Sequence, residues 1–150
     1  MTSLRARVFW LISHIAHALY SRFPIFGPIR GSLAMLHQDG GFVVIERNDG
    51  YGLGFPGGVA RWGEPPEKTV YREVLEETGL RISKATYKFD YVVPVPFPNH
   101  TYVFEASFDG ELRSSWEGSA RMATLEELQE RIVPQQRRVV EYLLERREPK

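Results

Sequence analysis

The sequence predicts a mixed α/β sandwich preceded by an extra amphipathic helix. Short runs rich in Val, Phe, Tyr and Thr alternate along the chain with segments of helical periodicity. The 150 residues fit one domain, and they are enough to bury a core without disulfides or a structural metal. We expect residues 1–30 to form the N-terminal helix and a linker, and residues 31–150 to form the main domain.

The composition excludes several kinds of function. The chain has no cysteine, which excludes disulfides, thiolate zinc sites and a cysteine nucleophile and suits a reducing, cytoplasmic location. Acidic and basic residues number 19 each, so the chain lacks the global positive charge of a nucleic-acid-binding protein. We therefore expect no nucleic-acid partner.

Residues 4–20 predict a helix, because their apolar positions fall in one stripe at about 100° per residue. The stripe consists of Leu4, Val8, Leu11, Ile12, Ile15 and Leu19. We expect this helix to dock on the domain or on a second subunit, which would give a homodimer. Two alternatives stay open: the basic start and apolar run resemble a signal peptide, and a basic amphipathic helix can lie on a membrane surface. Polar residues interrupt the segment too often for it to span a bilayer.

Turn signals divide the next part of the chain into short strands. Two prolines and a glycine make residues 23–28 a linker. Three predicted strands then lead toward a Pro-Gly-Gly sequence at 56–58. The strands are 31–37, 42–47 and 51–55, and the turns between them are 38–41, which makes a hairpin, and 48–50.

The second half predicts longer strands followed by two helices. The strands are 85–95, 100–108 and 120–123, and a polar loop at 114–119 precedes the last of them. Pro94, Pro96 and Pro98 crowd the junction of the first two strands, so we expect an irregular loop there. A capping-box pattern at 124–127 predicts a short helix through residue 128, and Pro134 starts a final helix that runs to about residue 147.

One segment concentrates negative charge: a glycine-rich loop leads into a helix predicted at residues 65–78. Two prolines suit its first turn, and Gly79 suits the left-handed residue that ends a helix. Seen along the axis, three carboxylates share one face and mainly apolar residues share the other. The carboxylates are those of Glu73, Glu76 and Glu77, and the other face carries Val70, Tyr71, Val74, Leu75 and Thr78. Because the apolar face must pack on the sheet, we expect the carboxylates to point toward a cleft or solvent.

Carboxylates gathered in this way suit a hard divalent cation. Magnesium typically takes one or two carboxylates and leaves its other positions to water and substrate phosphates. The glycines at 57, 58 and 63 allow close backbone approach to a phosphate chain, since no Cβ intrudes. One interpretation is therefore a metal-bridged phosphate attacked by water. The other is a solvated acidic helix face with Arg72 as a local ion-pair partner.

The spacing of this segment resembles the signature of the Nudix (MutT-like) hydrolases, G-x5-E-x7-R-E-U-x-E-E-x-G-U, in which U is an aliphatic residue. The matching residues are Gly58, Glu64, Arg72, Glu73, Val74, Glu76, Glu77, Gly79 and Leu80, which fill every fixed position. The predicted strands on both sides extend the resemblance to about residues 31–144. The N-terminal helix lies outside it.

The resemblance implies a Nudix-type α/β/α sandwich with a mixed sheet. It also implies hydrolysis of a nucleoside diphosphate linked to another moiety, with Mg²⁺ or Mn²⁺ as the cofactor. Carried over by position, Glu73, Glu76 and Glu77 are the implied metal ligands. The Gly57 carbonyl is a further implied ligand, and Gly57 with Gly58 forms the loop that faces the substrate.

The remaining implied roles surround that metal site. Glu64 is a supporting carboxylate or outer-shell ligand, and Arg72 holds a neighbouring glutamate in its rotamer through charge-assisted hydrogen bonds. The general base varies within the family. It is either a box glutamate or a carboxylate on a downstream loop, for which Glu117 is the candidate and Glu105 and Glu111 are weaker alternatives.

The resemblance leaves the substrate open. Pro96 lies where ADP-ribose-cleaving members carry a proline, but prolines also flank it, and a hydrolase of oxidised nucleotides or nucleoside triphosphates fits equally well. Trp62, Phe97 and Tyr102 are candidates to stack on a base. A different class of protein also stays open, namely a Nudix-fold module that binds a nucleotide without turnover. Such modules usually lack box glutamates, whereas this chain keeps them all.

Overall fold

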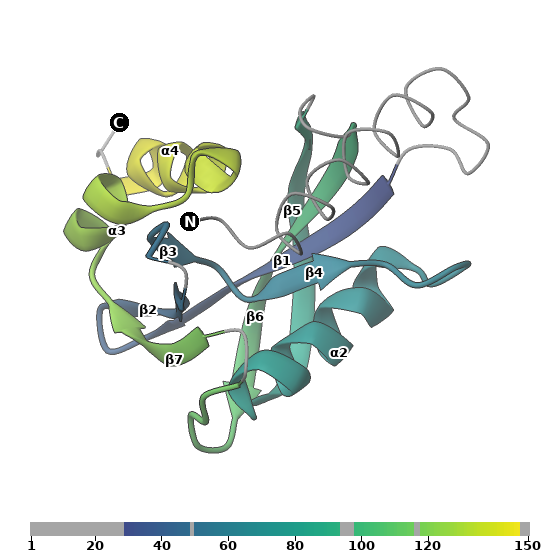
Figure 1. Cartoon of the computed structure of the whole chain (residues 1–150), viewed down its shortest axis with the longest axis horizontal. Helices are drawn as coiled ribbons and strands as arrows, with labels where there is room; N and C mark the ends of the chain where they lie inside the picture. The colour runs from purple at the N-terminus through teal and green to yellow at the C-terminus, as the bar shows by residue number, and fades with distance from the viewer. Residues whose placement is uncertain (1–28, 49, 94–97, 116–117, 148–150) are drawn as a thin grey trace, which may run out of the picture.

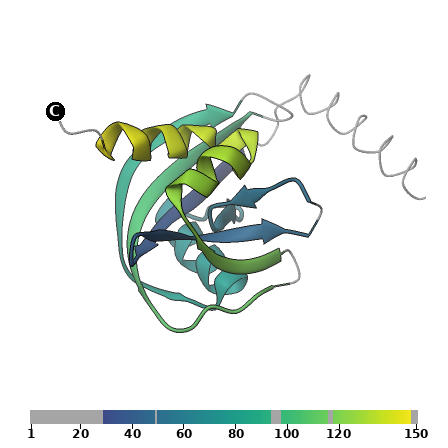
Figure 2. The ribbon, with the colours of Figure 1, turned by 90° about the vertical axis from the view of Figure 1, so that its left-hand side faces the viewer.

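The computed structural model describes residues 29–48, 50–93, 98–115 and 118–147. A mixed sheet lies between α2 (Pro66–Thr78) on one face and α3 (Leu125–Arg131) with α4 (Arg137–Arg147) on the other (Figure 1). Turned by 90°, the molecule has α3 and α4 in front of the strands and α2 behind them (Figure 2). The predicted α/β/α sandwich is confirmed. The predicted helix at 4–20, the linker and the loop residues 94–97 lie outside the described residues, so the division after residue 30 stays a prediction.

The central strand of the sheet, β1, pairs along both of its edges. The strands are β1 (Ile29–Gln38), β2 (Gly41–Arg47), β3 (Leu53–Gly54), β4 (Gly57–Val59), β5 (Arg81–Val93), β6 (Asn99–Asp109) and β7 (Gly118–Ala123). One edge of β1 pairs in parallel with β6, which continues antiparallel to β5, and the other edge pairs antiparallel with β4. The end of β1 turns into β2, which pairs antiparallel with β3 and β7. Asp39 and Gly40 make this hairpin turn with φ of 50° and 82°, as a two-residue hairpin loop requires.

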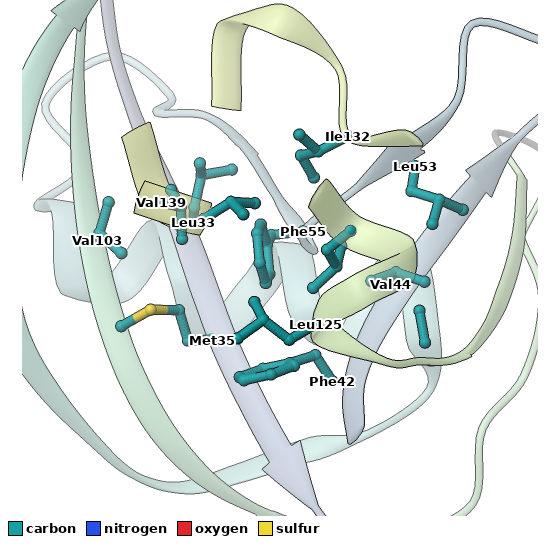
Figure 3. Packing of buried hydrophobic residues seen from close by; sticks show 13 residues of the cluster. Leu33, Met35, Phe42, Val44, Leu53, Phe55, Val103, Leu125, Ile132 and Val139 are labelled. Atoms are coloured by element: carbon teal, nitrogen blue, oxygen red, sulfur yellow. The ribbon is translucent and has the colours of Figure 1, made fainter. Parts of the chain in front are cut away.

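Alternating side chains of β1 build two cores, one on each face of the sheet. Leu33 and Met35 pack under α3 and α4, together with Phe42, Phe55 and Val139 (Figure 3). The alternate β1 residues, among them Leu36, pack under α2 with Val70, Val74 and Phe104. Because successive strand residues point to opposite faces, this one strand locates α2 relative to the rest of the core.

Four predicted boundaries were wrong. Residues 57–59 form strand β4 rather than a loop, and only two residues of the predicted strand 51–55 belong to β3. β5 begins at Arg81, directly after α2, rather than at residue 85. Ser119 lies in β7 rather than in the polar loop, since it pairs with Glu46 of β2.

The C-terminal helices follow the prediction with small changes. Thr124 caps α3 by accepting a hydrogen bond from the Glu127 backbone N–H at 3.2 Å. The Glu127 carboxylate, however, accepts hydrogen bonds from Arg121 and Arg131. α3 extends to Arg131 instead of ending at residue 128, and a 3₁₀ turn, η1 (Pro134–Gln136), leads into α4. Within the described ranges, no helix is long and apolar enough to cross a membrane.

Candidate active site

The helix α2 forms where it was predicted and carries the glutamates. It begins after Pro65 and ends at Gly79, whose φ of 74° and N–H bond to the Leu75 carbonyl, at 3.0 Å, mark a left-handed cap. Val70 and Val74 are fully buried, as expected. Leu75, which was placed on the packing face, is 47% exposed, because it lies at the margin of the buried stripe.

Arg72 is the hub of the site. Its guanidinium binds Glu64 through two nitrogens, at 3.0 and 2.8 Å. The Nη1 nitrogen donates to Glu73 at 2.6 Å and to Glu76 at 3.2 Å, and Nη2 donates to the Val59 carbonyl at 3.1 Å. The Arg72 side chain is only 16% exposed. One arginine thus joins three box glutamates to strand β4, and these contacts raise the pKa of Arg72.

Glu64 is held as a carboxylate. The Arg72 hydrogen bonds are the largest cause, and with further bonds from the Arg61 backbone N–H at 2.9 Å and the Thr69 hydroxyl at 3.0 Å they lower the pKa of Glu64 to about 2. Burial opposes this shift, but four donors outweigh it. Glu64 therefore ties the loop before α2 to the helix, and Thr69 is a contributor that the sequence did not reveal.

Glu77 behaves differently from the other two helix glutamates, and the expectation that all three point to a cleft or solvent was wrong for it. Glu77 is 9% exposed, and its Oε2 accepts the Gly57 N–H at 2.8 Å. The reason is its place next to the Val70–Val74 stripe, where α2 packs against β4. This hydrogen bond fixes β4 against the C-terminal part of α2.

The two glycines of β4 leave room for other groups. A Cβ on Gly57 would lie 2.0 Å from the Ser32 carbonyl oxygen, and the φ of Gly57 is +152°. A Cβ on Gly58 would lie 2.5 Å from the carboxylate carbon of Glu73. Gly57 thus permits the β1–β4 approach, whereas Gly58 leaves the space that the Glu73 carboxylate occupies.

Glu76 is the most accessible box glutamate that carries a described ion pair. Its side chain is 50% exposed, and its two oxygens contact different arginines: Oε1 contacts Arg61 at 3.2 Å, and Oε2 contacts Arg72 at 3.2 Å. The Arg61 side chain is 67% exposed. Arg61 is therefore a second, more exposed cation that contacts the carboxylate cluster.

The donor chemistry of the cluster fits a hard divalent cation. All of its acidic groups are carboxylates, the oxygen ligands that Mg²⁺ and Mn²⁺ prefer. In the part of the chain that the structure describes, no three acidic or histidine side chains converge as a ready metal-binding group. The cause is visible in the contacts, since Arg72 draws Glu73 and Glu76 to itself and Gly57 holds Glu77.

The structure bears differently on the three candidates for a downstream base. Glu117 lies outside the described residues, so its role stays a prediction. Glu105 faces the α4 side of the sheet, where it pairs with Lys88 at 2.5 Å and lines a cavity with Tyr142, and this position argues against it. Glu111 lines a cavity of about 620 Å³ whose described lining contains none of the α2 glutamates.

The structure describes two of the three aromatic candidates for base stacking. Trp62 is 86% exposed on the loop between β4 and α2. Tyr102 already stacks on His100, with ring centroids 4.5 Å apart. Phe97 lies outside the described residues.

A cavity of about 430 Å³ that was not predicted from the sequence adjoins β4. Its lining includes Gly57, Gly58, Tyr91, Asn99 and Gln136, which come from the three strands β4, β5 and β6 and from the turn η1. Within the described residues, the Asn99 Oδ1 is the buried side-chain polar atom that has no hydrogen-bond partner. The Gln136 Oε1 accepts the Phe55 N–H at 2.6 Å, so the amide NH₂ is the end that donates.

Comparison with known proteins agrees with this geometry. The model of the NUDIX domain family matches residues 27–143. A MutT-like protein of Streptomyces ambofaciens is 44% identical over 48 residues, which are 32% of this chain and only 31% of that protein. The crystal structure of a MutT NUDIX hydrolase from Burkholderia pseudomallei superposes with a TM-score of 0.68 and 27% identity, over 76% of this chain and 96% of that one. A putative nudix hydrolase family member from Chromobacterium violaceum gives a TM-score of 0.65 and 26% identity, over 83% of both chains.

The fold, the box residues on α2 and these matches define one class of protein. The chain belongs to the Nudix family, the family of the MutT-like hydrolases, and the match spans the described sheet and most of its helices.

Proposed function

We propose that the protein is a metal-dependent hydrolase that cleaves a pyrophosphate bond in a nucleoside diphosphate linked to another moiety. The observation that carries the proposal is the Arg72 hub, which gathers three box glutamates beside the Gly57–Gly58 backbone. Water attacks one phosphorus of the anhydride, the bridging P–O bond breaks, and the second phosphate group leaves with its oxygen.

In this proposal Glu73, Glu76 and Glu77 hold Mg²⁺ or Mn²⁺, and the Gly57 carbonyl contributes a further oxygen. The bound cation would neutralise charge on the phosphate oxygens and lower the pKa of the attacking water. The proposed role of Arg72 and Glu64 is to position other groups rather than to bind the substrate. Their paired hydrogen bonds set the positions of the loop and of Glu73. Glu117 is the proposed base on the downstream loop.

The cavity beside β4 is the proposed place for the nucleoside part of the substrate. It shares Gly57 and Gly58 with the carboxylate cluster, so a ligand seated there extends its phosphates toward α2. An unpartnered buried oxygen costs about 1–3 kcal/mol, and a donor group of the ligand would satisfy the Asn99 Oδ1. The Gln136 NH₂ would complement a carbonyl acceptor on a base or ribosyl group.

Two substrate types compete within this proposal: an ADP-ribose or nucleotide-sugar type, and an oxidised or ordinary nucleoside triphosphate. A screen of both types with Mg²⁺, in which the released mononucleotide, phosphate or pyrophosphate is identified, decides between them. Glu77→Gln is the matched variant, because a glutamine oxygen can still accept the Gly57 N–H while the negative charge is lost.

The expected result is turnover by the wild type and its loss in Glu77→Gln with an unchanged melting temperature. The alternative is a Nudix-fold module that binds nucleotides without turnover. A wild-type protein that binds nucleotides in the screen but releases no product would establish that alternative.

A further inference from the structure

Arg61 occupies one of the five positions between Gly58 and Glu64 that the Nudix signature leaves unspecified, so the signature assigns it no role. Its backbone is fixed, because the N–H donates to the Glu64 Oε2 at 2.9 Å. Its side chain is two-thirds exposed and reaches the Glu76 Oε1 at 3.2 Å. The loop thus holds a positive charge against a carboxylate of the proposed metal site.

The two arginines that contact Glu76 are not equivalent. Arg72 is 16% exposed and also binds Glu64 and Glu73, so moving it would disrupt the whole cluster. The Arg61–Glu76 pair joins side chains that are 67% and 50% exposed. Exposed pairs of this kind are weak and exchange readily. Arg61 is therefore the cation that can leave Glu76 without rearranging the fold.

We propose that Arg61 is a counter-ion that a divalent cation must displace from Glu76, and that it thereby sets the cation concentration at which the site fills. The inference rests on the proposed function, in which Glu76 is a metal ligand. An oxygen bonded to a guanidinium is less available to a metal, and the guanidinium charge repels an incoming cation. Because the pair is exposed, the effect is moderate, and losing Arg61 strengthens cation binding by about two- to fivefold.

The test is direct titration of the full-length protein with Mn²⁺, followed by electron paramagnetic resonance of the free ion and without substrate. Arg61→Gln removes the charge but keeps the backbone N–H to Glu64, and we expect it to bind Mn²⁺ about two- to fivefold more tightly. Arg61→Lys retains the charge and should bind within about twofold of the wild type. The Mg²⁺ concentration for half-maximal turnover should fall in Arg61→Gln in the same proportion.

Lys68→Gln is the matched control. Lys68 is an exposed cation on α2, about 12 Å from Glu76 along the helix axis, and its loss lowers the net charge of the chain by the same amount. An Mn²⁺ affinity that is unchanged or weaker in Arg61→Gln overturns the inference, and so does an equal gain in Lys68→Gln. A wild type that binds no Mn²⁺ overturns the proposed function itself, which keeps the two failures distinct.

Discussion

The guanidinium of Arg72 binds both carboxylate oxygens of Glu64, which lies before the helix that carries Arg72. This fork-to-fork contact spans eight residues, and the Arg72 Nη2 bond to the Val59 carbonyl closes the loop that contains Arg61, Trp62 and Gly63. A planar, two-point contact holds both partners in orientation as well as in distance. The loop and the helix therefore act as one rigid unit.

Replacing Arg72 by lysine should lower both stability and activity. Lysine keeps the charge but cannot make the two parallel bonds, nor reach Glu73, Glu76 and the Val59 carbonyl at once. We expect a loss of about 1–3 kcal/mol in the free energy of unfolding and about a tenfold or greater loss in kcat/KM. Denaturant unfolding and steady-state kinetics measure these quantities. Arg138→Lys, at an exposed pair on α4, is the control and should change stability by less than about 0.5 kcal/mol.

Glu64 should make the fold acid-sensitive in a defined window. Its folded-state pKa of about 2 lies below the ordinary 4.5, so the unfolded chain binds the proton more readily. The stabilisation is complete above about pH 4.5 and is lost as the pH falls toward 2. Urea unfolding at pH values across this window should show a shallower decline for Glu64→Gln than for the wild type. Identical slopes for the two proteins would contradict the assignment.

Gly58→Ala should impair activity while sparing the fold. The added Cβ meets the Glu73 carboxylate at 2.5 Å, and the end of a side chain can move aside at small cost. Moving a proposed metal ligand by this much should reduce kcat/KM by about 10- to 100-fold with little change in melting temperature. Gly54→Ala is the control, because its Cβ meets Gln136 at an ordinary 3.6 Å. Wild-type activity in Gly58→Ala would refute the idea.

Gly57→Ala should instead destabilise the fold. Here the Cβ meets the Ser32 carbonyl oxygen at 2.0 Å, and the backbone of β1 cannot move aside. The φ of +152° adds strain for any residue with a side chain. We expect a loss of more than about 1 kcal/mol in the free energy of unfolding. Of these two adjacent glycines, Gly57 would then matter for stability, which denaturation measures, and Gly58 for activity, which kinetics measure.

Asn99→Ala tests the cavity beside β4. The buried Oδ1 has no described partner to lose, so the free energy of unfolding should stay the same or increase. If a substrate group donates to this oxygen, KM should rise about three- to tenfold while kcat is kept. A lower stability with an unchanged KM would show that Asn99 serves the fold alone.

The sequence predicted the local parts of the site well. The span and caps of α2 follow from its prolines, its glutamate pattern and Gly79, and Arg72 hydrogen-bonds the neighbouring Glu73 as expected. The burial of Glu77 could not be foreseen, because it depends on a backbone N–H that lies 20 residues earlier, in a three-residue strand. A strand of this length is too short to show an alternating pattern of apolar and polar residues.

The cavity was unpredictable for a related reason. Asn99 and Gln136 are polar residues at element ends, and nothing in their neighbourhoods marks them. They line the same cavity only because β1 pairs with β6 and η1 packs on β3. The early start of β5 was missed because its first residues are mostly polar and exposed, which is the ordinary composition of an edge strand.

The position of β1 between β4 and β6 has a consequence for the order of folding. Both of the neighbours that β1 needs come later in the chain, and its parallel partner β6 begins only at Asn99. Helix α2 and its glutamates therefore leave the ribosome before the sheet that supports them can close. Such long-range parallel pairing folds slowly. The nascent chain thus carries its acidic helix without the complete sheet behind it until β6 emerges.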